Sequence, residues 1–187
     1  MAFDYPIVLD LAGVPVLVVG GGTIAQRKVE GLLAARATVT VVAPQVVESL
    51  RILPVRVLQR SYEPGDLEPV RLVITATDDP AVNASVAADA KDRGIWVNAA
   101  DDPANCTFTL PAVARDGAVT VAVSTGGSSP ALASHLRNEI SRWLAEIDAS
   151  GAAAALAEQR EALHASGVST ESVDWSDRVR AALRAQP

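Results

Sequence analysis

The sequence predicts an α/β fold: a doubly wound, mostly parallel β-sheet, followed by an appended antiparallel strand pair and a helical C-terminal region. Between residues 14 and 102, short apolar runs alternate with amphipathic stretches, which is typical of strand–helix–strand units with right-handed crossovers. A glycine-rich turn directly follows the first apolar run. After residue 102 the alternation stops, and two strand-like runs and alanine-rich helical segments follow.

The first predicted strand, residues 16–19, leads into the glycine turn of residues 20–25, which reads GGGTIA. In a Rossmann-type sheet this pattern binds a dinucleotide, because the absent Cβ of Gly22 lets the backbone approach the pyrophosphate and Ala25 allows close packing of helix and strand. The helix N-terminus then offers unpaired N–H groups to the phosphates. We expect the cofactor to contact Gly20, Gly21, Gly22, Thr23 and Ile24. The alternative is a glycine turn in a non-binding α/β protein.

The helix after this turn is expected over residues 23–36, because apolar side chains three and four positions apart give it one buried face. Residues 38–43 are mostly β-branched, as in a strand covered on both faces, and Pro44 ends that strand. The remaining elements are expected in the order short helix 45–53, strand 55–59, strand 72–76, helix 80–93 and strand 95–99. Ligands bind such sheets at the carboxyl ends of the strands, which here are residues 20–22, 43–45, 76–79 and 98–102.

The second part of the chain is expected to start with strands at residues 107–110 and 118–124, joined by a turn at 115–117; residues 111–114 are an alternative continuation of the first strand. An appended pair with an exposed edge favours pairing with another chain. The small-residue loop 124–129 precedes a helix that Ser129 would cap, with Pro130 at its first position. From residue 148 the chain reads as helical around a break at 166–170.

Composition excludes several classes of function. The net charge is −6, from 16 basic and 22 acidic residues without a Lys/Arg block, so neither nucleic acid nor an anionic membrane is an expected partner. The sequence contains no apolar stretch of the ~18–20 residues that a membrane helix needs. Cys106 is the only cysteine, which fits a reducing cytoplasm, and we expect a soluble cytoplasmic protein. His135 and His164 are far apart in the sequence, so no permanent metal site is expected.

Four motifs, taken together and in this order, resemble the precorrin-2 dehydrogenase family, which supplies the dehydrogenase and ferrochelatase module of sirohaem synthases. The motifs are residues 20–28 (GGGTIAQRK), 76–79 (ATDD), 97–101 (VNAAD) and 124–130 (STGGSSP), and the resemblance covers residues 5–145. It implies NAD+-dependent oxidation of precorrin-2 to sirohydrochlorin, with insertion of Fe2+ to give sirohaem in bifunctional members. It also implies a homodimer. The expected organisation is a NAD-binding Rossmann domain (1–102), a dimerisation and substrate region (103–147) and a C-terminal helical extension (148–187).

Asp101 is the predicted catalytic residue. It ends the fifth strand at the ligand-binding edge, where a carboxylate can take the proton that leaves with the hydride. It also aligns with the acidic residue that the resembling family uses. The alternative is that Asp101 or the adjacent Asp102 only caps a turn before Pro103. Metal insertion would run mainly through Asp101, and His135 is more readily explained as helix surface.

The cofactor prediction has one departure from the usual fingerprint. NAD-binding folds often carry Asp or Glu at the end of the second strand, but the sequence here is Ala43-Pro44-Gln45, without an acid and without a following arginine. The resemblance implies NAD, held through Pro44 and Gln45. Thr77 and Asp78 would flank the nicotinamide half.

A tetrapyrrole carries many carboxylates, so its binding residues would include local cations and N–H groups. Arg27, Lys28 and Arg137 are candidate cations, with solvated helix charge as the alternative. The predicted substrate-binding residues are Asn98, Thr125, Gly126, Gly127 and Ser128. Two other functions stay open: a dual enzyme that also inserts Fe2+, and a non-catalytic, dinucleotide-sensing Rossmann module.

Overall fold

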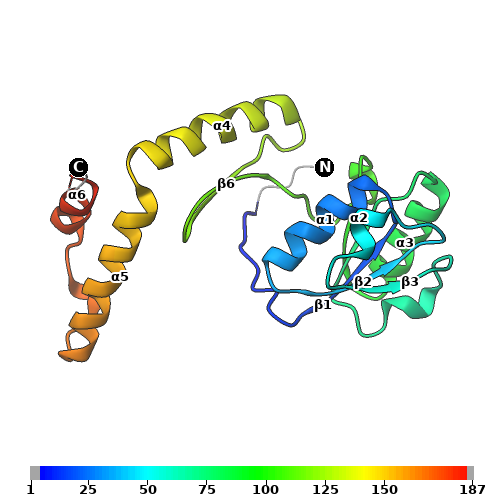
Figure 1. Cartoon of the computed structure of the whole chain (residues 1–187), viewed down its shortest axis with the longest axis horizontal. Helices are drawn as coiled ribbons and strands as arrows, with labels where there is room; N and C mark the ends of the chain where they lie inside the picture. The colour runs from blue at the N-terminus through cyan, green and yellow to red at the C-terminus, as the bar shows by residue number, and fades with distance from the viewer. Residues whose placement is uncertain (1–4, 185–187) are drawn as a thin grey trace. The chain divides into compact units, whose positions relative to one another are not determined.

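The computed structural model describes residues 5–184, and the chain divides into two compact units, residues 1–110 and 111–187. The first unit contains the strands β1–β5 and the helices α1–α3 (Figure 1). The second contains the strands β6 and β7 and the helices α4–α6. No helix in the described part of the chain is long and apolar enough to cross a bilayer.

The first unit is built on a five-stranded parallel sheet in the order β3-β2-β1-β4-β5. Its strands are β1 (Pro15–Val19), β2 (Thr38–Val42), β3 (Arg56–Leu58), β4 (Leu72–Thr75) and β5 (Trp96–Ala99). The central strand β1 pairs Val16 with Val39 of β2 on one side and with Leu72 of β4 on the other. The reversal of strand order between β1 and β4 leaves a crevice at the carboxyl ends of these strands. The doubly wound parallel sheet is thereby confirmed.

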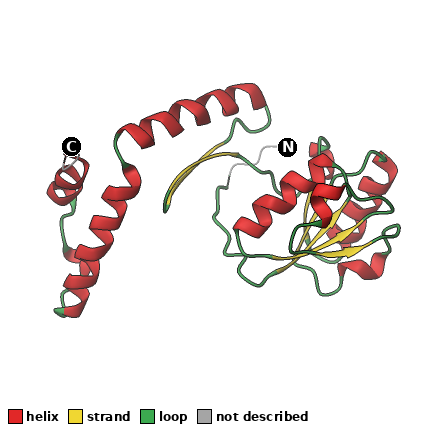
Figure 2. Ribbon diagram, in the orientation of Figure 1, coloured by secondary structure: helices red, strands yellow, loops and turns green. Residues whose placement is uncertain are grey.

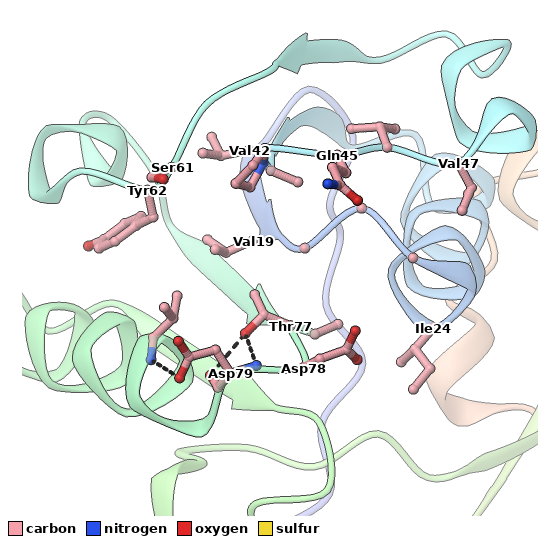
Figure 3. A pocket seen from close by; sticks show the side chains of 18 of the residues that line it. Val19, Ile24, Val42, Gln45, Val47, Ser61, Tyr62, Thr77, Asp78 and Asp79 are labelled. Carbon is pink, nitrogen blue, oxygen red and sulfur yellow. Dashed lines mark hydrogen bonds between the residues drawn. The ribbon is translucent and has the colours of Figure 1, made fainter.

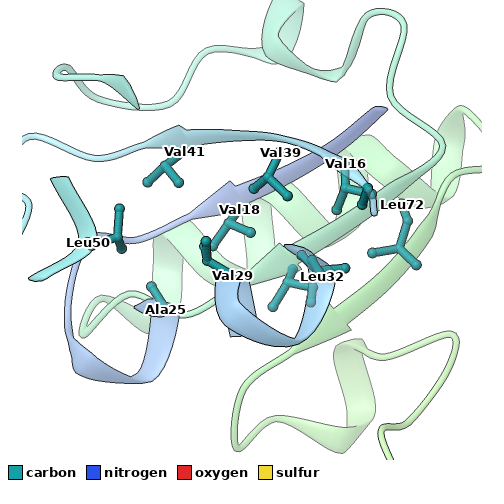
Figure 4. Close-up of a cluster of buried hydrophobic side chains, with 11 residues drawn as sticks. Val16, Val18, Ala25, Val29, Leu32, Val39, Val41, Leu50 and Leu72 are labelled. Atoms are coloured by element: carbon teal, nitrogen blue, oxygen red, sulfur yellow. The ribbon is translucent and has the colours of Figure 1, made fainter. Parts of the chain in front are cut away.

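Helices cover both faces of this sheet (Figure 2). The helices are α1 (Thr23–Ala34), α2 (Glu48–Arg51) and α3 (Pro80–Asp92), with short 3-10 turns at Pro64–Leu67 and Pro103–Asn105. Alternate side chains of β1 point to opposite faces, so Val16 and Val18 pack under α1 while Leu17 and Val19 pack under α3. Figure 4 shows the first of these cores, in which Val29 meets the β1 valines.

The expected strand at residues 107–110 was wrong. Only Thr107 joins the edge of β5: its N–H donates to Val97 O (2.8 Å), and its Oγ1 accepts from Val97 N (2.8 Å). The next residue, Phe108, turns its ring into the core beneath α1 and its carbonyl accepts from Asn98 Nδ2 (3.1 Å). One residue on an edge does not make a ladder, so the apolar run ends as an irregular segment.

The second unit starts with an antiparallel pair, β6 (Ala112–Asp116) and β7 (Val119–Val123), so the predicted pair exists but its first strand lies later in the chain. The turn predicted at 115–117 was also misplaced, since Arg115 and Asp116 belong to β6 and Gly117 makes the turn with φ +52°. The helices are α4 (Pro130–Glu146), α5 (Ala149–Ala165) and α6 (Ser176–Arg184), with a 3-10 turn at Thr170–Ser172. The predicted helical break after residue 165 is confirmed.

Candidate dinucleotide and active site

A cavity of about 780 Å³ lies at the carboxyl ends of β1, β2 and β4 (Figure 3). The residues that line it come from four loops of the first unit: 19–24, 42–47, 61–62 and 76–79, together with Val82. All nine residues that the sequence predicted for the cofactor line this cavity: Gly20, Gly21, Gly22, Thr23, Ile24, Pro44, Gln45, Thr77 and Asp78. Ser61 and Tyr62 also line it and were not predicted, because the run after β3 carries no recognisable motif.

The three glycines of the turn serve different purposes. A Cβ on Gly20 would overlap the carbonyl of Ala76, and a Cβ on Gly21 would overlap the carbonyl of Gln45, so both positions are fixed by close packing of neighbouring loops. Gly20 also has φ +129°, a conformation that favours glycine. A Cβ on Gly22 would meet no protein atom within 4 Å. Gly22 therefore faces open space that a ligand can occupy.

The N-terminus of α1 is open toward the cavity. Gly22 is its N-cap without a side-chain cap hydrogen bond, and the first turn of α1 carries no acidic residue. Gln26 N donates to Gly22 O (3.0 Å), so the regular helical bonds start there and the N–H groups of the preceding turn are left for a ligand. Such a terminus favours an anion, which fits the phosphates of a dinucleotide.

The β4–α3 loop is held by Asn83, a residue that sequence reasoning missed. Asn83 is 6% exposed; its Oδ1 accepts from Thr77 N (3.3 Å) and Thr77 Oγ1 (2.9 Å), and its Nδ2 donates to Thr77 O (3.0 Å). Asp79, not Asp78, caps α3 by accepting from Ala81 N (2.8 Å). Asp78 is thereby left to face the cavity. The only sequence signal for Asn83 is an amide one turn into an otherwise apolar helix face.

A second cavity, of about 360 Å³, adjoins the first. Asp101 and Asp102 line it from the end of β5, and it shares four lining residues with the larger cavity: Ile24, Ala76, Thr77 and Asp78. The loop at Thr77 and Asp78 is thus a common wall. A group bound in the larger cavity lies beside the compartment that contains Asp101.

Asp101 and Asp102 differ in their surroundings. Asp101 has φ +59° in the turn that Asp102 N closes on Ala99 O (3.3 Å), and among the described residues no hydrogen bond to its carboxylate is found. The Asp102 carboxylate accepts from Asn105 Nδ2 (2.7 Å). Asp102 therefore has a structural partner, while Asp101 is exposed and available for chemistry.

The buried thiol of Cys106 contacts the backbone of the same turn. Its Sγ accepts from Ala99 N (3.1 Å) and lies 3.3 Å from the carbonyls of both Ala99 and Asp102. Burial raises the pKa of the thiol above its usual value. Cys106 is therefore a structural residue, which agrees with its having no motif partner in the sequence.

Asn98, a predicted substrate residue, is not among the residues that line the two cavities. It is 7% exposed, and its Nδ2 donates to Phe108 O (3.1 Å). The structure thus uses its amide to hold the segment that follows β5. A substrate contact of Asn98 stays a prediction.

The other predicted substrate residues form the loop before α4 in the second unit. Thr125 Oγ1 donates to Ser129 O (3.1 Å) and accepts from Ser129 N (3.1 Å), while Ser129 Oγ caps α4 at Leu132 N (3.2 Å). Gly126 and Gly127 have φ of +60° and +86°. His135 is exposed on α4 near Glu139. Within residues 5–184 no group of three or more His, Cys, Asp or Glu side chains is placed to hold a metal ion.

Comparisons with known proteins give the family. Residues 7–112 match the model described as "Putative NAD(P)-binding", and residues 116–142 match "Sirohaem biosynthesis protein central". A solved structure, "SirC, precorrin-2 dehydrogenase", matches 97% of this chain and 98% of its own, with 31% identity and a TM-score of 0.74. The chain belongs to the precorrin-2 dehydrogenase family.

Two relatives of this family are longer than the chain. The siroheme synthase of Pseudomonas entomophila is 45% identical over 146 residues, which are 75% of this chain and 32% of that protein. The siroheme synthase of Methylococcus capsulatus is 48% identical over 142 residues, or 73% of this chain and 30% of that protein. The chain thus spans about a third of the length of these relatives. The family fits the geometry, since the open Gly22 position and the uncapped α1 terminus are suited to a nicotinamide dinucleotide.

Proposed function

We propose that the protein oxidises precorrin-2 to sirohydrochlorin with NAD+, as a step of sirohaem biosynthesis in the cytoplasm. The observation that carries this proposal is the common wall of the two cavities, which brings the larger cavity with its glycine turn beside the compartment that Asp101 lines. An oxidation by hydride transfer needs the cofactor ring against the substrate carbon and little other machinery. Family membership supplies the class of substrate, a tetrapyrrole.

The cofactor would be held by residues of the first unit. The pyrophosphate would lie at Gly22 and the first turn of α1, the adenosine half beside Pro44 and Gln45, and the nicotinamide half beside Thr77 and Asp78. NAD+ supplies the hydride acceptor when bound. NAD, rather than NADP, is favoured because none of the described residues that line the larger cavity is Lys or Arg, so a 2′-phosphate would meet no cation there.

Asp101 is the proposed proton acceptor. Oxidation removes a hydride and a proton from the substrate, and a carboxylate that is open to the cavity can take the proton. The exposed position of Asp101 and its lack of a described hydrogen-bond partner leave it free for that role. Insertion of Fe2+ as a second substrate would use the same carboxylate, and it stays a prediction.

The substrate would bring its carboxylates to the loop of Thr125, Gly126, Gly127 and Ser128, and to the cations Arg27, Lys28 and Arg137.

We also propose a homodimer. The helix α4 exposes Leu132 (49%), Leu136 (40%) and Trp143 (55%), and β6 and β7 form a two-stranded sheet with free edges within the described chain. Apolar side chains at helical spacing beside open strand edges favour pairing with a second copy. Light scattering tests this, and a monomer would contradict it.

An anaerobic assay of the pure protein with enzymatically made precorrin-2 and NAD+ tests the reaction. We expect a sirohydrochlorin spectrum that depends on NAD+, with one NADH formed per substrate oxidised. Addition of Fe2+ after oxidation then tests metal insertion against a protein-free control. Binding of NAD+ without turnover of active precorrin-2 would contradict the proposal and favour the non-catalytic, dinucleotide-sensing module.

A further inference from the structure

The adenosine end of the larger cavity lies between the ends of β2 and β3. In doubly wound sheets the residue that binds the adenosine ribose follows the second strand, so the ribose is expected at Pro44 and Gln45. Strand β3 pairs with β2 through Leu58 and Val42, so the chain after Leu58 continues along the same edge. Ser61 and Tyr62 from this stretch line the cavity (Figure 3). Charged side chains next to Ser61 therefore influence whether the bound ribose can carry a 2′-phosphate.

Arg60 is the cation next to this wall, and it is already paired. Its Nη1 donates to Ser61 O (2.9 Å) and to Asp66 Oδ2 (2.8 Å), and its Nη2 donates to Asp66 Oδ1 (2.5 Å). The guanidinium thus makes a two-bond, charge-assisted pair with one carboxylate, which is a strong geometry. Because the pair uses Nη1 and Nη2 together, it holds the plane of the guanidinium in one orientation.

The carboxylate of Asp66 is held in a fixed position. Its side chain is 6% exposed, whereas that of Arg60 is 39% exposed. Its Oδ2 also accepts from Glu63 N (2.9 Å), which anchors the carboxylate to the start of the 3-10 turn at Pro64–Leu67. The hydrogen bond from Arg60 lowers the pKa of Asp66 below its usual value, so the carboxylate stays charged at neutral pH.

The other cation at this edge, Arg51, is engaged as well. Its Nη2 donates to Gln59 Oε1 (3.1 Å), and Gln59 Nε2 donates to Pro44 O (3.3 Å). Its Nε lies 3.9 Å from Glu48 Oε2. Each of the two arginines next to the adenosine end is therefore bound to partners of its own chain.

We propose that Asp66 is a specificity-determining residue, which holds Arg60 away from the adenosine ribose and so makes the cavity select the dinucleotide without a 2′-phosphate. A 2′-phosphate needs a cation, usually an arginine, near the ribose. The Asp66 carboxylate satisfies Arg60, the arginine next to Ser61. This inference rests on the proposed preference for NAD, but not on precorrin-2 oxidation.

The test compares the affinities of NAD+ and NADP+ by calorimetric titration of the full chain. Asp66→Asn removes the charge but keeps an oxygen for Glu63 N–H, so Arg60 loses its ion pair while the turn retains its bond. We expect this variant to bind NADP+ about tenfold tighter than the wild type does, with NAD+ binding unchanged, which is the gain of one hydrogen bond to a charged group. The double variant Asp66→Asn with Arg60→Gln is the matched control and should lose that gain. An unchanged ratio of the two affinities in folded Asp66→Asn would overturn the proposal.

A second variant keeps the proposal testable even if Asp66→Asn does not fold. In Arg60→Gln with Asp66 intact, we expect the weak binding of NADP+ to be the same as in the wild type, because the arginine is already engaged. A loss of NADP+ affinity in this variant would show that Arg60 contacts the phosphate, and would overturn the proposal. The failure of precorrin-2 oxidation is a separate result, since it would leave these binding ratios as predicted.

Discussion

The side-chain amide of Asn83 makes three hydrogen bonds with the backbone and hydroxyl of Thr77: Oδ1 accepts two and Nδ2 donates one. Thr77 belongs to the wall that separates the two cavities. One buried amide on α3 therefore fixes the position of a loop that lines both the larger cavity and the compartment of Asp101. Neither residue needs to touch the substrate for this contact to matter.

Replacement of Asn83 by Ala should loosen this wall. We expect the variant to lose roughly 2–3 kcal/mol of unfolding free energy, because several backbone and hydroxyl groups of Thr77 lose their partner in a buried site. We also expect a higher KM for NAD+. Urea denaturation and steady-state kinetics measure the two effects. Asn83→Asp is the comparison, since it keeps the acceptor and loses the donor, and a wild-type KM in Asn83→Ala would contradict the positioning role.

Two adjacent glycines should respond differently to the same substitution. Gly21→Ala places a Cβ against Gln45 O, so we expect it to destabilise the protein by roughly 1–3 kcal/mol through overpacking. Gly22→Ala meets open space at an extended backbone position, so its melting temperature should stay near that of the wild type. If phosphates approach Gly22, its NAD+ affinity should still fall at least tenfold. Thermal unfolding and calorimetry check the pair, and normal NAD+ binding by Gly22→Ala would place the pyrophosphate elsewhere.

Asp101→Asn should abolish most of the oxidation of precorrin-2. We expect kcat to fall on the order of 100-fold or more, which is the usual contribution of a positioned base, while binding of NAD+ is unchanged. Asp102→Asn is the matched control, because the neighbouring carboxylate is bonded to Asn105 and should affect kcat far less. Equal effects of the two substitutions would remove Asp101 from its assigned role.

The backbone of Asp101 gives an independent expectation. Its φ of +59° is unfavourable for a side chain with a Cβ and acceptable for glycine. Asp101→Gly should therefore raise the unfolding free energy by roughly 0.5–1 kcal/mol while it removes activity. A stability measurement on this variant separates strain at the turn from the chemistry of the carboxylate.

The Arg60–Asp66 pair should make stability depend on pH in the acid range. A carboxyl whose pKa is lower in the folded than in the unfolded protein stabilises the fold above the unfolded value of about 3.9, and this contribution is lost as pH falls through the folded value. The difference in unfolding free energy between the wild type and Asp66→Asn should thus be full at pH 6 and shrink below about pH 4. Urea denaturation across this range measures it, and a difference that does not vary with pH would contradict the shifted pKa.

The sequence predicted the parallel sheet and the glycine turn because both are written in local patterns. A β-branched run such as residues 38–43 indicates a buried strand, and glycines between a strand and a helix indicate a turn that phosphates can approach. The packing of Ala76 and Gln45 carbonyls against Gly20 and Gly21 was not predicted. The structure adds what those patterns cannot contain. Tyr62 reaches the cavity through packing between elements far apart in the chain. Asn83 lies only six residues after Thr77, but its role depends on where its amide points, and the sequence marks it by no motif.

The two errors in the second half have a common physical cause. Residues 107–110 have the composition of a strand, but only Thr107 finds a free position on the edge of β5. Arg115 and Asp116 have the composition of a turn, but they lie in a two-stranded sheet where polar residues are tolerated. Gly117, which has a positive φ in the structure, marked the turn better than the polar residues Arg115 and Asp116 did.

The short contact between Thr107 and Val97 has a further consequence for the behaviour of the protein at high concentration. An open edge of a parallel sheet is a template on which strands of other molecules can add, and this is a common origin of aggregates. Here the segment after β5 occupies Val97, the middle of that edge, with both a backbone donor and a side-chain acceptor. At the opposite edge, β3 is only three residues long. Both borders of the main sheet are thereby poor sites for the uncontrolled addition of strands from other molecules.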